Sequence, residues 1–315
     1  MSKIRDFCNA DLPGLARVWS DHWSQVDIPP PISASIIERA LLSRSFFEPN
    51  HLLVAEQDSR VEAWCQWNRT DPCGPAEESH ETVVLSAICF SQAGLESCDD
   101  LLTAAETDVR ASGHTTITVG PLRDDRFGYV GLPPIGHGIG IPETDVRVAS
   151  LLTRHGYSPQ GSYSRLVVPT APYRAPVNRE MMQLRRTTRT ETCSVMPNGG
   201  RQAAAMSHLD IENHILVNHR SGEHLASLRL WLSDPDSQVM SCSEAILDLT
   251  PIDSAGCLTA AESFLIAAVI RTLANRCIFQ VETAVDSEDQ ALVGQLEALS
   301  FRCTQRGRRW RKELT

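Results

Sequence analysis

The chain has 315 residues, 42% of them hydrophobic and 22% charged, which suffices for two globular domains with cores of their own and makes disorder unexpected. Its formal net charge at pH 7 is -10. The excess of acid falls in residues 1–170, where 13 Lys and Arg face 22 Asp and Glu, against 16 and 17 in residues 171–315. This balance argues against a nucleic-acid partner and mildly favours a cationic or amine substrate.

The ten cysteines form no C-x-x-C pair, and the sequence shows no secretory signal. We therefore expect a reduced, cytoplasmic chain without disulfides, in which buried thiols act as small apolar groups. The longest strongly apolar stretch, residues 264–270, is far too short to span a bilayer, so no membrane partner is expected.

The first elements in chain order are a short strand, two helices and a hairpin. Residues 4–7 read as a strand, and residues 9–25 read as a helix with an Asn or Asp cap and an early proline. Ser33 caps a second helix. Residues 51–57 and 61–68 have the composition of strands joined by a tight turn.

A strand, a bend and a long amphipathic helix then form one block. Residues 82–90 are an apolar, β-branched run of buried-strand length, residues 91–97 are the bend, and residues 98–112 carry apolar side chains at helical spacing before Gly113. Such a bend can present backbone N–H groups and a helix N-terminus to a phosphate. A further strand is predicted at residues 115–119.

A Gly/Pro-rich loop, a helix and a linker end the first half. We expect residues 127–142 to form part of a cleft wall rather than a solvated loop, with Tyr129 and His137 as polar tips. The reason is that ligands of α/β sheets bind beyond the carboxyl ends of the strands. A helix ends near residue 157, and the prolines of residues 170–176 mark the linker.

The second half begins differently from the first. Residues 182–193 are predicted as a strand, residues 197–206 as a short helical region, and residues 214–218 and 225–232 as a hairpin. Residues 302–311 end the chain as a half-exposed edge strand.

The strand, bend and helix block then recurs. A strand is predicted at residues 245–250, a bend at residues 251–257 and a helix through residues 264–273. A strand at residues 278–282 and a helix that ends near residue 301 follow, in the order of the first half. An internal repeat of a whole domain is hard to produce by chance.

This order of elements, with helix ends at residues 151–157 and 296–301, resembles the GNAT acyltransferases, which transfer an acyl group from acyl-coenzyme A to an amine. The resemblance implies an α/β fold with a mixed sheet, as two tandem GNAT domains at residues 1–170 and 181–315 joined by residues 171–180. Mycothiol acetyltransferases have a similar layout. The resemblance also implies acetyl-coenzyme A as the donor and a small-molecule amine or a peptide as the acceptor.

The resemblance implies a coenzyme loop of the pattern Gln/Arg-x-x-Gly-x-Gly/Ala. In the first domain this loop falls on residues 93–98, which lack the Arg and place Glu96 at the central Gly. A carboxylate ~6 Å from a phosphate costs roughly 3 kcal/mol at an effective dielectric of about 20, or about a hundredfold in affinity. The residues implied for the coenzyme are Ile88, Phe90, Gly94, Leu95, Ser97 and Cys98.

In the second domain the loop falls on residues 257–262, or on residues 254–259 in a shifted register, and neither register restores the Arg. One interpretation is weakened binding of acetyl-coenzyme A. The other is that both loops are ordinary strand-to-helix connections, in a catalytically inactive binding or scaffold protein that keeps the fold. The residues implied for the coenzyme here are Leu249, Thr250, Gly256, Cys257, Leu258, Thr259 and Ala260.

Acyl transfer to an amine needs a base for the amine proton and an acid for the leaving thiolate. Asp248, flanked by apolar residues on the central strand of the second domain, is the candidate base, and the alternative is a strand-end carboxylate paired with an arginine. Leu152 and Leu296 replace the tyrosine that the family commonly uses as the acid. Tyr129 is therefore the candidate acid, with Tyr157 as the alternative.

Four histidines, at positions 208, 214, 219 and 224, lie close together in the sequence. Their spacing matches neither a helical i,i+4 pair nor a zinc knuckle. The sequence therefore predicts no metal site there.

Overall fold

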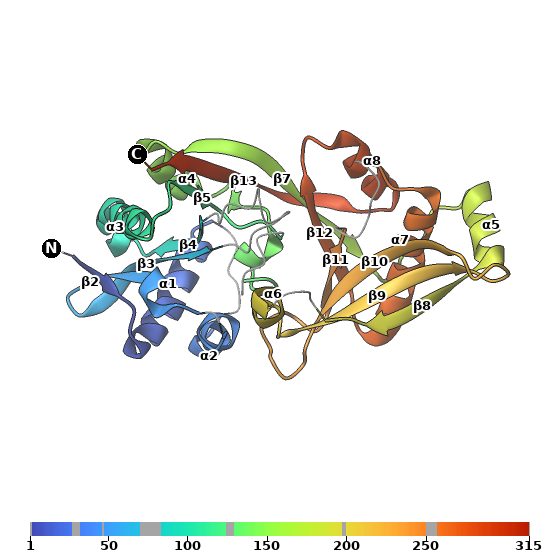
Figure 1. The fold of residues 1–315 in the computed structure, drawn as a ribbon, viewed down its shortest axis with the longest axis horizontal. Helices are drawn as coiled ribbons and strands as arrows, with labels where there is room; N and C mark the ends of the chain where they lie inside the picture. Colours follow the sequence, from blue (N-terminus) through green and yellow to red (C-terminus); the bar gives the residue numbers. More distant parts are fainter. Residues whose placement is uncertain are drawn as a thin grey trace. The chain divides into compact units, whose positions relative to one another are not determined.

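The computed structural model describes residues 2–26, 32–45, 47–69, 83–123, 129–196, 200–249 and 257–314. The chain divides into two units, drawn as a ribbon in Figure 1: the first comprises Met1–Ser162, Gly199–Met206 and Gly307–Thr315, and the second comprises Tyr163–Asn198 and Ser207–Arg306. Each has a mixed sheet with helices against it, which confirms the predicted fold class. The predicted domain division at residues 171–180 stays a prediction.

In the first unit, neighbouring strands follow the order β1-β2-β3-β4-β5-β13. β4 and β5 run parallel, and the other neighbouring pairs run antiparallel. The strands are β1 (Lys3–Asp6), β2 (Leu52–Gln57), β3 (Arg60–Arg69), β4 (Val83–Phe90), β5 (Thr116–Val119), β6 (Ile141–Pro142), the start of β7 (Ser158–Pro169) and the end of β13 (Arg302–Glu313). The helices are α1 (Leu12–Ser24), α2 (Ala34–Ile37), α3 (Cys98–Ala111), α4 (Val146–Arg154) and α6 (Gly200–Ala205).

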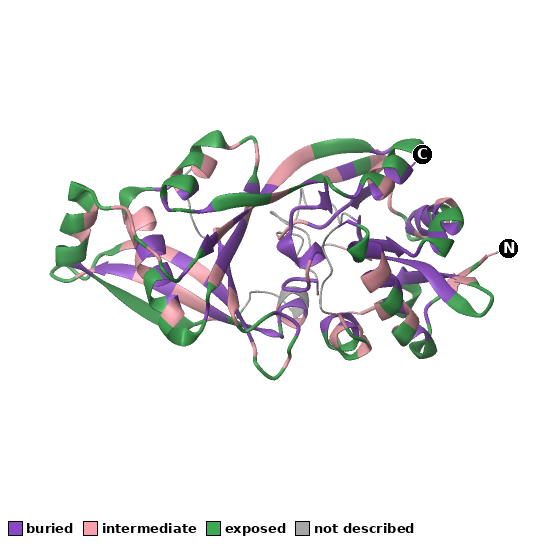
Figure 2. Cartoon of the chain, turned by 180° about the vertical axis from the view of Figure 1, so that it is seen from behind, coloured by how far each residue is buried: buried purple, intermediate pink, exposed green. Residues whose placement is uncertain are grey.

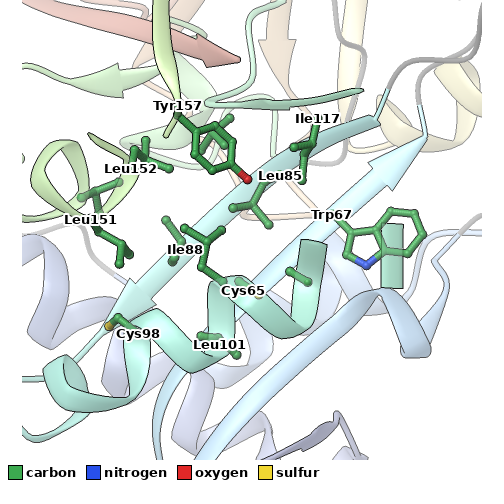
Figure 3. Packing of buried hydrophobic residues seen from close by; sticks show 14 of the residues in the cluster. Cys65, Trp67, Leu85, Ile88, Cys98, Leu101, Ile117, Leu151, Leu152 and Tyr157 are labelled. Carbon is green, nitrogen blue, oxygen red and sulfur yellow. The ribbon is translucent and has the colours of Figure 1, made fainter. Parts of the chain in front are cut away.

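Strand β3 is buried on both faces, and this places helices on both sides of the sheet. Trp64 stacks on Trp19 of α1 with ring centroids 5.9 Å apart, whereas Cys65 and Trp67 belong to the apolar cluster that includes α3. Because successive strand side chains point to opposite faces, α1 and α3 cover opposite faces of the sheet, as Figure 1 shows. The α3 side chains in that cluster, some of them drawn in Figure 3, are Cys98, Leu101, Leu102, Ala105 and Val109.

Strand β1 is tied to the turn before α1 by a partly buried ion pair. Arg5 donates to both carboxylate oxygens of Asp11, at 2.7 Å from Nη1 and 2.8 Å from Nη2, and it also binds Glu56. Because of the hydrogen bonds from Arg5 above all, the pKa of Asp11 falls from its ordinary value of 3.8 to about 2.

This ion pair predicts a loss of stability in acid. A carboxyl group whose pKa is lower in the folded than in the unfolded chain stabilises the fold when the pH is above the unfolded-state pKa. That stabilisation is lost as the pH falls through the folded-state pKa. The free energy of unfolding should therefore drop as the pH falls from 3.8 to about 2. Urea unfolding at stepped pH should show that Asp11→Asn removes part of this drop. Asp58→Asn, in the exposed β2–β3 turn, is the matched control and should keep it all, and an identical drop in both variants would refute the assignment.

In the second unit, neighbouring strands follow the order β7-β12-β11-β10-β9-β8, with β11 and β12 parallel and the other pairs antiparallel. Their bounds are β8 (Thr188–Ser194), β9 (Leu209–Asn218), β10 (His224–Ser233), β11 (Glu244–Asp248) and β12 (Gln280–Asp286), and the helices are α5 (Arg179–Thr187), α7 (Ala260–Leu273) and α8 (Gln290–Ala298). The predicted hairpin and short helix are confirmed, as are the strands and helices of the second block, whereas the bend predicted at residues 251–257 lies outside the described residues except for Cys257.

The strand predicted over residues 182–193 is wrong in its first half, where α5 lies instead. Asn178 caps this helix by accepting a hydrogen bond from the backbone N–H of Met181 at 2.8 Å. Met181 and Leu184, at i and i+3, pack against the core of the second unit. A cap followed by apolar residues at this spacing favours a helix, and only Thr188–Ser194 forms the strand.

Each unit is completed by a strand from the other half of the sequence. Tyr163–Pro169 of β7 pair with β12 in the second unit, and Trp310–Glu313 of β13 pair with β5 in the first. The final strand is half-exposed, as predicted, but it is not an edge strand, because β5 and the first residues of β7 flank its second half.

The burial pattern separates core from surface along the second unit, as Figure 2 shows. The buried side chains of α7 (Leu265, Ile266, Ala267, Val269, Ile270 and Leu273) belong to the core, whereas α5 has no fully buried side chain. In the described parts of the chain no helix has the length and apolarity to cross a membrane. The nine cysteines that the structure describes are free thiols.

Candidate functional site

The parallel strands β4 and β5 separate in the first unit. Their pairing covers Val83 to Leu85 on β4 and ends opposite Val119, while β4 continues to Phe90. A gap between separating parallel strands is where a ligand would enter such a sheet. Ile88, predicted to bind the coenzyme, lies in the apolar core, as Figure 3 shows.

The bend after β4 is a short 3-10 helix, Ala93–Ser97, packed tightly on β3. A side chain at Gly94 would overlap the carbonyl oxygen of Glu62, so glycine is needed for close packing. The N–H of Gly94 donates to Ser91 Oγ at 3.1 Å, and Ser91 Oγ donates to Glu62 Oε2 at 2.6 Å. This predicted phosphate-facing amide is therefore satisfied inside the protein.

A cavity of about 240 Å³ lies between the start of α3 and α4. Of the six residues predicted for the coenzyme in this unit, Phe90, Leu95 and Cys98 line it, and the remaining lining is Val146, Arg147, Ser150, Leu151 and Arg154. Burial raises the pKa of Cys98 to about 12, so this thiol stays protonated and is no nucleophile at neutral pH.

Both arginines of this cavity are engaged by the protein. Arg154 binds both carboxylate oxygens of Asp99, at 3.0 and 3.1 Å. The guanidinium of Arg147 lies 4.9 Å from the ring centroid of Phe90 and donates to the carbonyl oxygen of His22 at 3.0 Å. An anion in this cavity would compete with those contacts.

His22 of α1 packs against the end of β4 and bonds to its backbone, a role that the sequence analysis missed. Its Nε2 lies 2.8 Å from Asp145 Oδ2, and both side chains are fully buried. Its Nδ1 accepts a hydrogen bond from the backbone N–H of Phe90 at 3.3 Å. The signal in the sequence was the position of His22 in the apolar stripe of α1, beside Trp19 and Trp23.

Tyr129, the candidate acid, packs against the same helix as His22, α1. Its ring stacks on Trp19 with centroids 6.1 Å apart, and its hydroxyl donates to Gln66. Burial raises the pKa of Tyr129 well above its ordinary value, which favours a structural hydroxyl over a proton donor that turns over. The segment from Tyr129 to Pro142 is buried almost throughout and is thus a packed wall, while residues 127 and 128 lie outside the described residues.

Tyr157, the alternative acid, also lies in the core. Figure 3 shows its ring beside Leu152 with the hydroxyl directed towards Leu85. Burial raises the pKa of its hydroxyl. Neither tyrosine is placed to protonate a leaving thiolate in a solvated cleft.

The corresponding strands of the second unit, β11 and β12, separate after Ile246 and Glu282. Asp248 lies beyond that point at the carboxyl end of β11, with 5% of its surface exposed, and its cross-strand neighbour on β10 is Arg229. Thr283 Oγ1 donates to the carbonyl oxygen of Leu247 at 2.9 Å and bridges the two strands.

The start of α7 carries a complete capping box. Thr259 Oγ1 accepts from the N–H of Glu262 at 3.2 Å, and the Glu262 carboxylate accepts from the N–H of Thr259 at 2.7 Å. Gln295 of α8 binds the N–H and the carbonyl oxygen of Leu258 at 2.6 and 2.9 Å. The amides of Leu258 and Thr259, two of those predicted to face a phosphate, therefore have internal partners.

Of the remaining residues predicted for the coenzyme in this unit, Cys257 and Ala260 are exposed beside the cap and Leu249 is half-buried after Asp248. Thr250 and Gly256 lie outside the described residues.

All four histidines of the group lie within the described residues. His214 lies between Thr192 and Glu212, with its Nδ1 3.0 Å from Thr192 Oγ1, and burial lowers its pKa. Among the described residues no group of three or more His, Cys, Asp or Glu side chains could hold a metal ion.

Comparison with protein-family models and with curated proteins gives no match. Comparison with solved structures gives whole-chain matches. A tandem GNAT protein from the clavulanic acid biosynthesis pathway is 12% identical with a TM-score of 0.66, over 99% of this chain and 98% of that one. A GCN5-related N-acetyltransferase from Sphaerobacter thermophilus is 13% identical with a TM-score of 0.62, over 99% and 95%.

A third match is a GCN5-related glucosamine N-acetyltransferase region of a fungal multi-domain β-N-acetylglucosaminidase, 12% identical with a TM-score of 0.68 over 99% of this chain and 38% of that one. At such identities the likeness concerns the fold. It confirms the resemblance inferred from the sequence: the chain has the tandem GNAT fold.

Proposed function

We propose, from the tandem GNAT fold, that this chain transfers an acyl group from an acyl-coenzyme A to an amine, and that its second unit carries the reaction. The observation that supports this most is the position of Asp248, a buried carboxylate just beyond the point where the parallel strands β11 and β12 separate. A carboxylate there can take the proton of an attacking amine.

In this proposal the donor lies along the end of β11 and the start of α7. Leu249, Thr250, Gly256 and Cys257 would line the coenzyme chain, and its phosphates would lie at the start of α7, beside Leu258, Thr259 and Ala260. The donor is acetyl-coenzyme A or a related thioester, and the acceptor a small-molecule amine or a peptide amine.

The first unit would have a structural role. The backbone N–H of Phe90 at the end of β4 is bonded to His22, and Tyr129 is stacked on Trp19 in the core, so neither group would be available to a donor. We propose that the cavity beside Phe90 is a remnant of a donor site.

A second candidate function, a non-catalytic binding or scaffold protein, is favoured by a specific observation. The loop amides of Gly94, Leu258 and Thr259 are all bonded to protein side chains. A helix start that must hold a pyrophosphate usually leaves such donors free.

Titration calorimetry with acetyl-coenzyme A separates the two candidates. We expect the wild type to bind more weakly than 1 μM, because the Glu262 carboxylate at the start of α7 repels phosphates. Glu262→Gln keeps the capping box, since Gln also serves at this position, but removes the charge. Binding should then tighten by up to about a hundredfold. Glu223→Gln, in the exposed β9–β10 turn, should leave affinity unchanged.

Release of free coenzyme thiol in the presence of a panel of amines tests catalysis directly. Asp248→Asn should abolish amine-dependent release while acetyl-coenzyme A binding persists. Submicromolar binding of acetyl-coenzyme A by the wild type would contradict the inference that Glu262 repels its phosphates. No binding at millimolar donor, in the wild type and in Glu262→Gln alike, would favour the non-catalytic candidate.

A further inference from the structure

Helix α7 carries apolar side chains on two faces, and the second face borders a cavity. Leu265, Val269 and Leu273 belong to the core of the second unit. Phe264, Ala267, Ala268 and Arg271, at i, i+3, i+4 and i+7, form a second stripe along the helix, in which Phe264 and Ala267 also contact that core.

The cover over this second stripe is incomplete. Helix α5 and the segment from Tyr173 to Val177 lie against it and leave a cavity of about 280 Å³ within the second unit. The two alanines make room there, because larger residues at these positions would fill it. Met181 and Met182 add flexible apolar walls, and Met182 and Val177 are exposed by 48% and 78%.

Three arginines from three different segments line the same cavity: Arg174 before α5, Arg185 within α5 and Arg271 at the end of the α7 stripe. In the described part of the chain, no Asp or Glu forms a salt bridge with any of them. Arg165 and Arg276 of this unit, by contrast, pair with Glu282 and Glu212. All three are exposed at the cavity, and their combined positive charge would attract an anion there.

We propose that this cavity binds a medium-chain fatty acid, with its alkyl chain against Phe264, Ala268 and the two methionines and its carboxylate among the three arginines. A guanidinium pairs bidentately with a carboxylate, and the apolar lining gains by removing the chain from water. The site is separate from the end of β11 and the start of α7, and none of its lining residues takes part in the proposed acyl transfer.

Calorimetry with decanoate below its micelle concentration tests the proposal on the full chain. The wild type should bind decanoate at least tenfold more tightly than decanol, which has the same chain without the charge. Arg271→Gln should weaken decanoate binding at least tenfold, and Ala268→Phe, which fills the cavity, should abolish it. Arg186→Gln is the matched control, since Arg186 is an exposed neighbour on α5 outside the cavity, and it should bind as the wild type does.

Methyl NMR of methionine-labelled protein locates the ligand and does not depend on a variant that folds. Decanoate should shift the methyl signals of Met181 and Met182 and leave that of Met240, buried elsewhere in this unit, in place. The proposal is overturned if decanoate does not bind, if decanol or decyl phosphate binds as tightly or more tightly, if Arg271→Gln binds like the wild type, or if Met240 alone shifts.

Discussion

A chain that ends at Arg306 is expected to lose the fold of its first unit. Residues 307–315 belong to that unit, where Trp310 and Leu314 are buried in the core with 8% and 5% of their surface exposed. Loss of a buried tryptophan alone costs about 3–5 kcal/mol. The truncation also leaves β5 without its antiparallel neighbour, so the total is comparable to the whole stability of a typical domain, about 5–15 kcal/mol.

Hydrogen exchange measures this loss in each unit separately. Amides of Ile117 and Val119 in β5 should lose their protection in the truncated chain, and amides of Leu228 and Leu230 in β10 should retain most of theirs. Addition of a peptide of residues 302–315 should restore protection in β5. Unchanged protection of β5 after truncation would mean that the final strand is dispensable.

Lys312→Met tests the same strand without shortening it. Lys312 Nζ lies 2.7 Å from both carboxylate oxygens of Glu106, which is 4% exposed. Removal of one partner of a buried ion pair typically costs about 3–5 kcal/mol. The neighbouring Arg311→Gln changes an exposed pair with Glu313, so urea unfolding should show a change within about 0.5 kcal/mol.

His22→Ala is expected to destabilise the first unit by about 3–5 kcal/mol, because it leaves the Asp145 carboxylate buried without its partner and the Phe90 amide without its acceptor. Asp145→Asn should cost less, about 1–3 kcal/mol, since asparagine can still cap α4 through the N–H of Val148.

Urea unfolding followed by tryptophan fluorescence suits this comparison, because Trp19 and Trp23 flank His22 on α1. His219→Ala, at an exposed position after β9, should stay within about 0.5 kcal/mol of the wild type. Equal effects of the three substitutions would show that the His22–Asp145 pair carries no special stability.

The elements that depend on local pattern could be predicted from the sequence. The run from Val83 to Phe90 and the helix from Cys98 to Ala111 were visible from apolar spacing, and Ser33 was recognisable as a cap. The prediction of one strand over residues 182–193 was wrong in its first half. The apolar residues of the short helix α5 directly precede strand β8, and in the sequence the two together resemble one longer strand.

The site depends on contacts between distant residues, which local pattern does not encode. His22 and Asp145 are 123 positions apart, and Leu258 and Gln295 are 37 apart. The sequence showed that the coenzyme loops depart from the family pattern, but not that Ser91, Gln295 and Glu262 occupy their amides.

The exchange of strands between the halves of the sequence has a consequence for synthesis on the ribosome. Domains at the amino end of a chain generally fold as soon as they emerge. Here the strand that borders β5 is translated after the whole second unit, so the first unit must wait, incomplete, until Lys312 and its neighbours have left the exit tunnel. During that interval the unpaired side of β5 and the carboxylate of Glu106 are exposed to the cell. A stop codon a few residues early would thus damage the part of the protein that was made first.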